Sequence, residues 1–256
     1  MYLWRRSASP RWLNANEDEL RALAGDRLAI IERPNRRRLQ LEAASQSRGL
    51  LQKVARQFGG RIEKLPRHWL KRSLRRKTKP LKVGNKKLIV PAGRAFGTGE
   101  HATTAMCLRL LEQVSRSWKR DWSIVDLGTG SGIFALAAKL LGATRVIGID
   151  NDPIAISTAK QNARLNKIRG ARFQVSDVRR WIFPRRIDII TANLFSELLI
   201  ELLPKLKTAR WLILSGILHE QERDVIRALK RNKIDIVEVR RRGKWVAILA
   251  NCSGAL

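Results

Sequence analysis

The second half of the chain alternates between short apolar runs and segments in which apolar residues recur every three or four positions. The first pattern indicates buried strands, and the second indicates amphipathic helices. The expected strands are 123–127, 144–149, 173–176, 187–192 and 211–214, and the expected helices are 132–141, 153–165, 196–206 and 219–231. Two further runs, 234–240 and 244–250, flank R-R-R-G and predict an antiparallel hairpin at one edge. This alternation predicts a Rossmann-like α/β domain with a mostly parallel, seven-stranded sheet covered on both faces.

The first 65 residues show a different pattern, with four short strands and two helices. The expected strands are 2–8, 27–32, 38–42 and 61–65. Asn16, followed by three acids that the helix dipole favours, marks the start of one helix. Ser45 marks the start of the other, which Gly59 and Gly60 end. The order β-α-β-β-α-β is that of a small ferredoxin-like domain.

The distribution of charge indicates where the two domains join. Twelve lysines and arginines occur between Glu63 and Glu100 without a single acid. We therefore interpret 1–65 as the small domain, 66–94 as a basic linker and 95–256 as the larger domain. The formal net charge of the whole chain is +30. Such an excess predicts a polyanionic partner such as RNA or a very acidic partner, or else only a solvated basic surface.

A glycine-rich loop follows the first strand of the larger domain. It reads D-L-G-T-G-S-G, residues 126–132, and Asp150 ends the next strand along the chain. Glycines let the backbone approach a ligand, and an acid at this distance can accept from ribose hydroxyls. A dinucleotide site needs a third glycine in G-x-G-x-x-G, which this loop lacks. Asp126 would repel a pyrophosphate and suits a cationic amino-acid ligand, so the loop is similar to the first motif of S-adenosylmethionine (SAM) methyltransferases.

A second segment, A-F-G-T-G-E-H-A-T-T at residues 95–104, also has the character of a ligand loop. Gly97 and Gly99 keep its first part out of a helix, and Thr103 or Thr104 then opens one. Backbone N–H groups and hydroxyls at a helix start can hold a ligand. The alternative is a simple helix cap.

Other features of the chain exclude several classes of protein. Cys107 and Cys252 form neither a disulfide framework nor a metal-ligand spacing. We therefore expect no metal. The first ten residues lack the apolar stretch of a signal peptide, and no run has the length of a membrane span. We expect a cytoplasmic protein that does not enter a membrane.

Several segments together resemble one family. The two loops above are followed by T-A-N-L-F-S-E-L-L-I-E-L-L-P, L-I-L-S-G-I-L-H-E-Q and G-K-W-V-A-I-L. These resemble the methyltransferases of ribosomal protein L11, the PrmA family, and the resemblance covers residues 88–256. It implies a class I methyltransferase domain, SAM as cofactor, and methylation of amino groups of a ribosomal protein. It also implies that the domain at 1–65 recognises the substrate. The run of cations, by itself, predicts contact of the basic segment 64–87 with ribosomal RNA, the alternative being a solvated linker. We expect a monomer.

The resemblance also assigns roles to individual residues. It implies a cofactor site formed by Thr104, Gly128, Gly130, Asp150, Asp177 and Asn193. Asn193, at the tip of the fourth strand, is the candidate catalytic residue, because its side-chain oxygen can accept from an attacking amine. Asp177 would contact the adenine amino group. Phe96 and His101 lie in the family's loop over the cofactor, and neither is assigned a step.

Two alternative functions stay open at this point. An RNA methyltransferase would use the basic charge and an asparagine at the same place. Those enzymes usually read Asn-Pro-Pro-Tyr/Phe, whereas residues 193–196 here read N-L-F-S. A non-catalytic, basic RNA-binding module is the second alternative. The sequence also departs from the PrmA pattern, with P-A-G-R at 91–94 in place of Asp-Pro-Gly and with His101-Ala102 in place of His-Pro.

Overall fold

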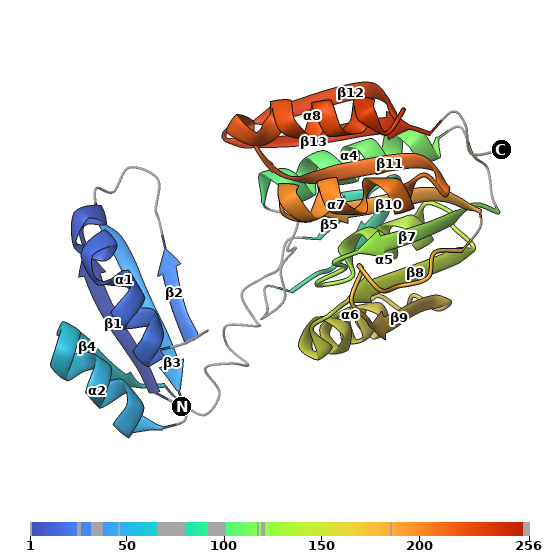
Figure 1. Ribbon diagram of the computed structural model, residues 1–256. Helices are drawn as coiled ribbons and strands as arrows, with labels where there is room; N and C mark the ends of the chain where they lie inside the picture. Colours follow the sequence, from blue (N-terminus) through green and yellow to red (C-terminus); the bar gives the residue numbers. More distant parts are fainter. Residues whose placement is uncertain are drawn as a thin grey trace. The chain divides into compact units, whose positions relative to one another are not determined.

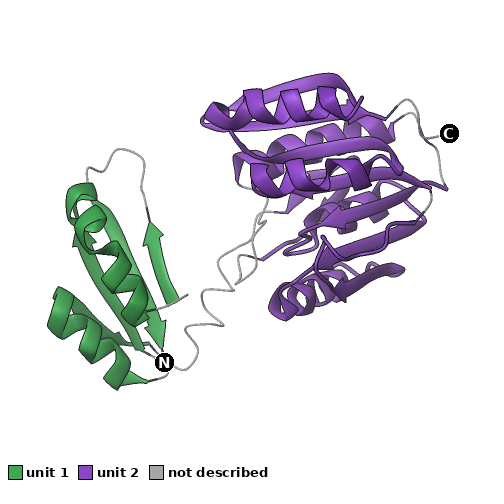
Figure 2. Cartoon of the chain, viewed as in Figure 1, with its two compact units in different colours: residues 1–75 green, residues 76–256 purple. Residues whose placement is uncertain are grey.

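A computed structural model of the chain shows two compact units, residues 1–75 and 76–256 (Figure 2). It describes residues 2–24, 27–31, 38–45, 47–65, 80–91, 101–116, 118, 121–184 and 186–252. Most cations of the basic segment 64–87, and the first part of the 95–104 loop with Phe96, lie outside the described residues.

The first unit has the element order β-α-β-β-α-β (Figure 1). Its elements are β1 Tyr2–Ala8, α1 Pro10–Ala24, β2 Leu28–Ile31, β3 Leu39–Ser45, α2 Arg48–Phe58 and β4 Arg61–Lys64. The strands pair antiparallel in the order β2-β3-β1-β4. The two helices and the sheet share a core that includes the fully buried Trp4, Leu20 and Leu51. This is the element order of a ferredoxin-like unit.

The helices of this unit begin at other residues than the sequence predicted. Helix α1 begins at Pro10, where a proline costs no hydrogen bond, and the backbone N–H of Trp12 donates to Ser9 Oγ at 3.1 Å. Asn16 therefore lies inside the helix, where its side chain donates to the Trp12 carbonyl at 2.8 Å. Helix α2 is capped by Ser47, not by Ser45. The acids at 17–19 favoured Asn16 as the helix cap in the sequence, although Ser9 caps the helix earlier in the chain.

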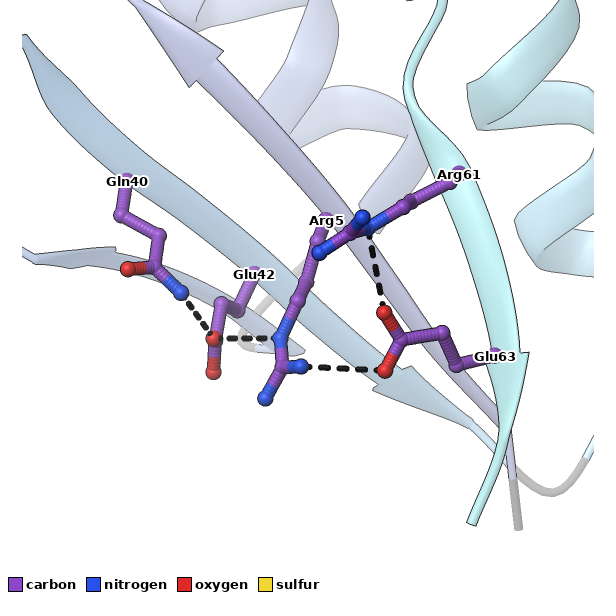
Figure 3. A network of polar contacts seen from close by, with 5 residues as sticks. All are labelled: Arg5, Gln40, Glu42, Arg61 and Glu63. Atoms are coloured by element: carbon purple, nitrogen blue, oxygen red, sulfur yellow. Dashed lines mark hydrogen bonds and ion pairs between the residues drawn. The ribbon is translucent and has the colours of Figure 1, made fainter.

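A polar network lies on the sheet of the first unit (Figure 3). Arg5 of β1 donates to Glu42 of β3 at 2.8 Å and to Glu63 of β4 at 3.0 Å. Gln40 also donates to Glu42, at 2.6 Å, and Arg61 pairs with Glu63 at 3.1 Å. Because neighbouring residues of a strand point to opposite faces, Arg5 lies on the face away from the core that buries Trp4. The network joins three strands on this half-exposed face.

The second unit contains a seven-stranded sheet in the order β12-β13-β11-β10-β7-β8-β9 (Figure 1). The strands are β7 Ser123–Leu127, β8 Arg145–Asp150, β9 Ala171–Val175, β10 Ile187–Asn193, β11 Ala209–Leu218, β12 Asp235–Arg242 and β13 Trp245–Asn251. The five strands from β11 to β9 are parallel, and β13 pairs antiparallel with both β11 and β12. The predicted fold class is thus confirmed, with the antiparallel hairpin at one edge.

Helices cover both faces of this sheet. They are α4 Ala102–Ser115, α5 Ile133–Leu140, α6 Pro153–Leu165, α7 Ser196–Leu206 and α8 Glu222–Arg231, the last after a 3-10 turn at His219–Gln221. One core cluster joins α4, α5 and α6 to the sheet, and a second joins α7 and α8 to its other face. None of the helices in the described part of the chain is long and apolar enough to cross a membrane.

Part of the expected linker is folded. Residues 80–91 contain the hairpin of β5 Leu81–Val83 and β6 Lys86–Leu88. Val83, Leu88 and Val90 are buried in the core of the second unit. The side chain of Asn166 accepts from the backbone N–H of Ile89 and donates to its carbonyl, both at 2.7 Å. Three lysines within the hairpin, Lys82, Lys86 and Lys87, gave it the appearance of a solvated linker.

Candidate active site

A pocket of about 470 Å³ lies at the carboxyl ends of the parallel strands in the second unit. Strands β7 and β10 are neighbours there, although the chain visits β8 and β9 between them. The helices after β7 and β10 therefore leave toward opposite faces of the sheet, which opens a crevice at this point. The residues that line the pocket are His101, Thr103, Gly128, Gly130, Asp150, Asn151, Asp152, Ala155, Asp177, Val178, Arg179, Asn193, Leu194, Phe195, Leu198, Gly216 and Trp245.

The glycine-rich loop and Asp150 form one wall of the pocket. The Asp150 carboxylate accepts from the backbone N–H of Gly130 at 2.9 Å and from that of Asp152 at 3.0 Å. These two bonds fix the carboxylate at the tip of β8 and leave lone pairs for a ligand, because a carboxylate has about four acceptor positions. The structure thus brings Gly128, Gly130 and Asp150 to one site, as the sequence predicted.

Asp126 does not face the pocket, contrary to the interpretation of its charge from the sequence. The side chain is fully buried, and the hydroxyls of Thr129 and Thr191 donate to its two oxygens at 2.6 and 2.7 Å. Burial raises the pKa of Asp126 to about 6, although these hydrogen bonds oppose the shift. The carboxylate ties the loop after β7 to strand β10. Its role is to hold the site together, and it is too deep to contact a cationic ligand.

Asn193 lies at the carboxyl end of β10 and is oriented by a chain of polar groups. Its Nδ2 donates to Thr103 Oγ1 at 3.2 Å, and Thr103 Oγ1 lies 2.7 Å from Nδ1 of His101. Burial, and then the charge of Lys244, lower the pKa of His101, so its ring is neutral at pH 7. A neutral ring can accept the Thr103 proton at Nδ1. With Nδ2 engaged by Thr103, the carboxamide oxygen of Asn193 is available to a ligand.

Thr103, rather than Thr104, contributes the hydroxyl at this wall. Thr104 does not line the pocket, and its side chain is fully buried, with no hydrogen-bond partner for Oγ1 among the residues that the structure describes. Consecutive residues of a helix point about 100° apart, so the side chain of Thr104 is turned away from the wall that Thr103 forms. The expected assignment of Thr104 to the cofactor site stays a prediction that the geometry does not favour.

The backbone after Asn193 is held close to two glycines. A Cβ on Gly216, whose φ is +86°, would lie 2.2 Å from the Leu194 carbonyl oxygen. A Cβ on Gly128, whose φ is +66°, would lie 2.5 Å from a methyl group of Leu194. The backbone conformation favours glycine at both positions, and at Gly216 the close Leu194 backbone also leaves no space for a Cβ. They let the segment after β10 lie directly against the glycine-rich loop.

The opposite side of the pocket is apolar and includes aromatic residues. Phe195, at the start of α7, is 79% exposed, and Leu198 follows it one turn later. The rings of Trp245 and His101 meet edge to face, with centroids 5.1 Å apart. An exposed phenylalanine beside Asn193 gives this side of the pocket a surface suited to an apolar chain.

Asp177 lies at the pocket just after β9. Its Oδ1 accepts from the backbone N–H of Arg179 at 2.9 Å, which turns the chain at this point. The Arg179 guanidinium pairs with Glu201 at 3.0 Å and is thus directed toward α7. The second carboxylate oxygen of Asp177 is available to a ligand in the pocket.

A family model described as ribosomal protein L11 methyltransferase (PrmA) matches residues 65–252. The chain belongs to this family. Among its PrmA relatives, a protein named ribosomal protein L11 methyltransferase from Pelobacter propionicus is 37% identical over 194 residues, which are 67% of this chain and 62% of that protein. A protein of the same name from Clostridium perfringens is 35% identical over 193 residues, 67% of this chain and 60% of that protein. The chain therefore spans about three fifths of the length of these curated relatives.

A solved structure supports the same assignment to the PrmA family. The crystal structure of a ribosomal protein L11 methylase from Lactobacillus delbrueckii subsp. bulgaricus superposes with a TM-score of 0.56 and 32% sequence identity. The match covers 61% of this chain and 80% of that one. These relatives do not favour the alternatives of an RNA methyltransferase or a non-catalytic module.

The pocket residues of this PrmA chain that sequence reasoning missed include Thr103, Phe195 and Trp245. Thr103 was considered as the start of α4, but its neighbour Thr104 was assigned to the site. Phe195 was considered only as part of N-L-F-S, which lacks the two prolines of Asn-Pro-Pro-Tyr/Phe. Its position two residues after Asn193 could have indicated a place at the rim of the pocket. Trp245 carries no such signal, because it enters the pocket from the closing hairpin. Within the described ranges, no three His, Cys, Asp or Glu side chains are grouped as metal ligands.

Proposed function

We propose that this chain is a SAM-dependent methyltransferase that methylates amino groups of ribosomal protein L11. The observation that carries the proposal is the orientation of Asn193. In a chain of the PrmA family, its carboxamide oxygen is directed by Thr103 into a pocket that also contains Asp150. An acceptor for amine protons and an acceptor for ribose hydroxyls thus line the same cavity.

The chemistry of the pocket fits SAM. Asp150 would accept from the ribose hydroxyls, and Asp177 would accept from the adenine amino group, because each keeps acceptor capacity beyond its backbone contacts. Gly128 and Gly130 bring the backbone of the glycine-rich loop to the wall of the pocket. Val178 and Ala155 supply apolar surface beside these carboxylates. When bound, SAM supplies a methyl group on a sulfonium, which is already activated toward an amine.

The contribution of the chain is then mainly positioning and exclusion of water. A lysine amine has a reference pKa of about 10.4 and must lose a proton before its lone pair can react. The apolar surfaces of Phe195 and Leu198 disfavour the charged form of an amine that enters beside them. The oxygen of Asn193 would accept an N–H bond of the neutral amine and so orient its lone pair.

Substrate recognition is assigned to the first unit. The β-α-β-β-α-β unit at the N-terminal end has its own core and a polar sheet face, and it contains no residue of the pocket. We propose that it contacts the ribosomal protein. The proposed contact of segment 64–87 with ribosomal RNA, a cytoplasmic location and a monomeric state are further expectations. Light scattering of the purified chain tests the last of these.

The decisive experiment is a transfer assay with SAM labelled in its methyl group. Ribosomal protein L11, other separated ribosomal proteins and ribosomal RNA are offered as acceptors, and we expect label in L11. Asn193→Ala should lower the rate of transfer far more than it lowers the SAM affinity measured by calorimetry. Label in RNA, with none in any protein, would overturn the proposal in favour of the RNA methyltransferase alternative. A wild-type chain that binds no SAM would remove the proposed function altogether.

A further inference from the structure

A small hollow of about 230 Å³ lies between α4 and β12, outside the candidate active site. It is lined by Ala105, Met106, Arg109, Arg240, Arg241 and Arg242. Four of its six lining residues are thus arginines. Helix α4 and strand β12 are in contact, so this concentration of cations belongs to ordered elements of the second unit.

Two of the four arginines already have acidic partners. Arg241 pairs with Glu222 of α8 on the other face of the sheet, as expected from the alternation along a strand. Arg240 donates to Glu238 at 2.6 Å and to Gln113 of α4 at 2.6 Å. These contacts pair the guanidinium groups of Arg240 and Arg241 with carboxylates.

Arg109 and Arg242 have no such partner. Both side chains are exposed, and no ion pair or side-chain hydrogen bond within the described part of the chain involves either of them. Since like charges at one hollow repel each other, an anion bound there would lower the electrostatic energy. A guanidinium presents paired N–H donors in a geometry that matches a phosphate group.

The cationic surface continues along α4. A second hollow, of about 650 Å³, shares Ala105 and Arg109 with the first and is also lined by Lys82, Glu112 and Arg116. Arg109 and Arg116 are seven residues apart on the helix, which corresponds to about 10 Å along its axis. Lys82 comes from the β5–β6 hairpin, and Glu112 accepts from the backbone N–H of Gly84 in the same hairpin. The two hollows thus adjoin at Ala105 and Arg109, and together they are here called the arginine groove.

We propose that the arginine groove binds the phosphate backbone of an RNA strand. A chain of phosphates carries a charge on every nucleotide and can meet successive cations along a groove, as single strands do on other proteins. The net charge of +30 indicates a partner of high charge density, which RNA has and an ordinary acidic protein segment lacks. The residues of this groove do not line the pocket of Asn193, so the proposal goes beyond methyl transfer and can fail independently of it.

The test compares two double variants with equal loss of charge. Arg109→Gln with Arg242→Gln removes the cations without a partner. Lys160→Gln with Arg164→Gln removes two exposed cations of α6, which packs on β8 and β9 at the other edge of the sheet. The probe is a fluorescently labelled single-stranded oligouridylate, and its affinity for the full chain is measured between 50 and 200 mM salt, a range over which phosphate contacts change affinity strongly.

We expect the groove variant to lower the slope of log affinity against log salt by about 0.7 per lost phosphate contact. Its affinity should fall by about an order of magnitude at 100 mM salt, whereas the α6 variant should keep the wild-type slope. Arg109→Lys with Arg242→Lys should keep most of the slope, because the charge is retained. Equal slopes for the groove and α6 variants, or an equal loss with lysine and glutamine, would overturn the proposal.

Two further probes separate RNA from other anions. If polyglutamate loses as much affinity as the oligouridylate in the groove variant, the groove is a site for acidic protein segments and the RNA proposal is wrong. If inorganic phosphate binds the wild-type chain as tightly as the oligouridylate does, the groove is a site for the free ion and the proposal is again wrong. SAM affinity and thermal unfolding, measured on every variant, should equal those of the wild type. If the glutamine double variant has a lower SAM affinity or a lower unfolding temperature than the wild type, the salt slope of the lysine double variant decides the proposal.

Discussion

Asn193 Nδ2 donates to Thr103 Oγ1 at 3.2 Å, and this bond joins the tip of β10 to the first turn of α4. A carboxamide can present either its oxygen or its nitrogen to a ligand, and the contact with Thr103 selects the oxygen. His101, whose Nδ1 lies 2.7 Å from the same hydroxyl, fixes the direction of the Thr103 proton. An amine that accepts a methyl group donates N–H bonds and needs an oxygen at this place. Asn193 and Thr103 together therefore determine that the site can bind an amine.

The adjacent threonines of α4 allow a matched test of this relationship. Thr103→Val keeps the shape and removes the hydroxyl that orients Asn193, so we expect methyl transfer to fall about ten-fold or more, with SAM affinity nearly unchanged. Thr103→Ser should restore most of the rate. Thr104→Val is the control, because Thr104 Oγ1 is buried and has no partner within the described ranges, so its removal should cost neither rate nor stability. Loss of SAM affinity in Thr104→Val alone would instead support the assignment made from the sequence.

Asp150 is expected to contribute to cofactor affinity. Asp150→Ala removes a carboxylate that would accept from ribose hydroxyls, and SAM affinity measured by calorimetry should weaken by roughly 1.5–3 kcal/mol. Part of this loss reflects the loop, because Asp150 also accepts from Gly130 and Asp152. Asp150→Asn keeps an acceptor for one of these bonds and should lose less. Unchanged affinity in both variants would remove Asp150 from the cofactor site.

Phe195 is expected to act on the acceptor and not on the cofactor. Its side chain is 79% exposed at the rim of the pocket, where the chain of a substrate lysine can cover it. Phe195→Ala should raise KM for the protein substrate about ten-fold, since covering such a ring contributes one or two kcal/mol. SAM affinity should stay the same. Ile182→Ala is the control, because Ile182 is 88% exposed and does not line the pocket. Equal effects of the two substitutions would exclude a specific role for Phe195.

Local sequence patterns were sufficient for much of the fold. The bounds of β7, α6 and α7 agree with the expected ranges, because their apolar residues follow the period of one element without interruption. The β5–β6 hairpin was missed because lysines at Lys82, Lys86 and Lys87 outnumber its buried residues.

The candidate site was less predictable, because it depends on the directions of side chains. The sequence placed Asp150 and Asn193 at strand ends, where parallel strands bring them to one edge. It could not distinguish Thr103 from Thr104, since a shift of one residue turns a helical side chain by about 100°. It also could not show that Asp126 is covered by Thr129 and Thr191, which come from a loop and a strand that meet only in the folded chain.

Asp126 should make the stability of the second unit depend on pH. Burial raises its pKa from 3.8 to about 6, so the folded chain holds this proton more tightly than the unfolded chain does. The contribution of this group to the free energy of unfolding is therefore largest below about pH 4, falls as the pH rises toward 6, and is constant above that. The difference amounts to roughly 3 kcal/mol.

Asp126→Asn cannot ionise, so urea unfolding at pH 4, 5, 6 and 7 should show that wild type loses stability relative to the variant as the pH rises. Thr129 and Thr191 need an acceptor at both oxygens, so the variant starts from a lower stability at pH 4. A stability difference that stays constant from pH 4 to 7 would show that Asp126 is already ionised at pH 4 in the folded chain.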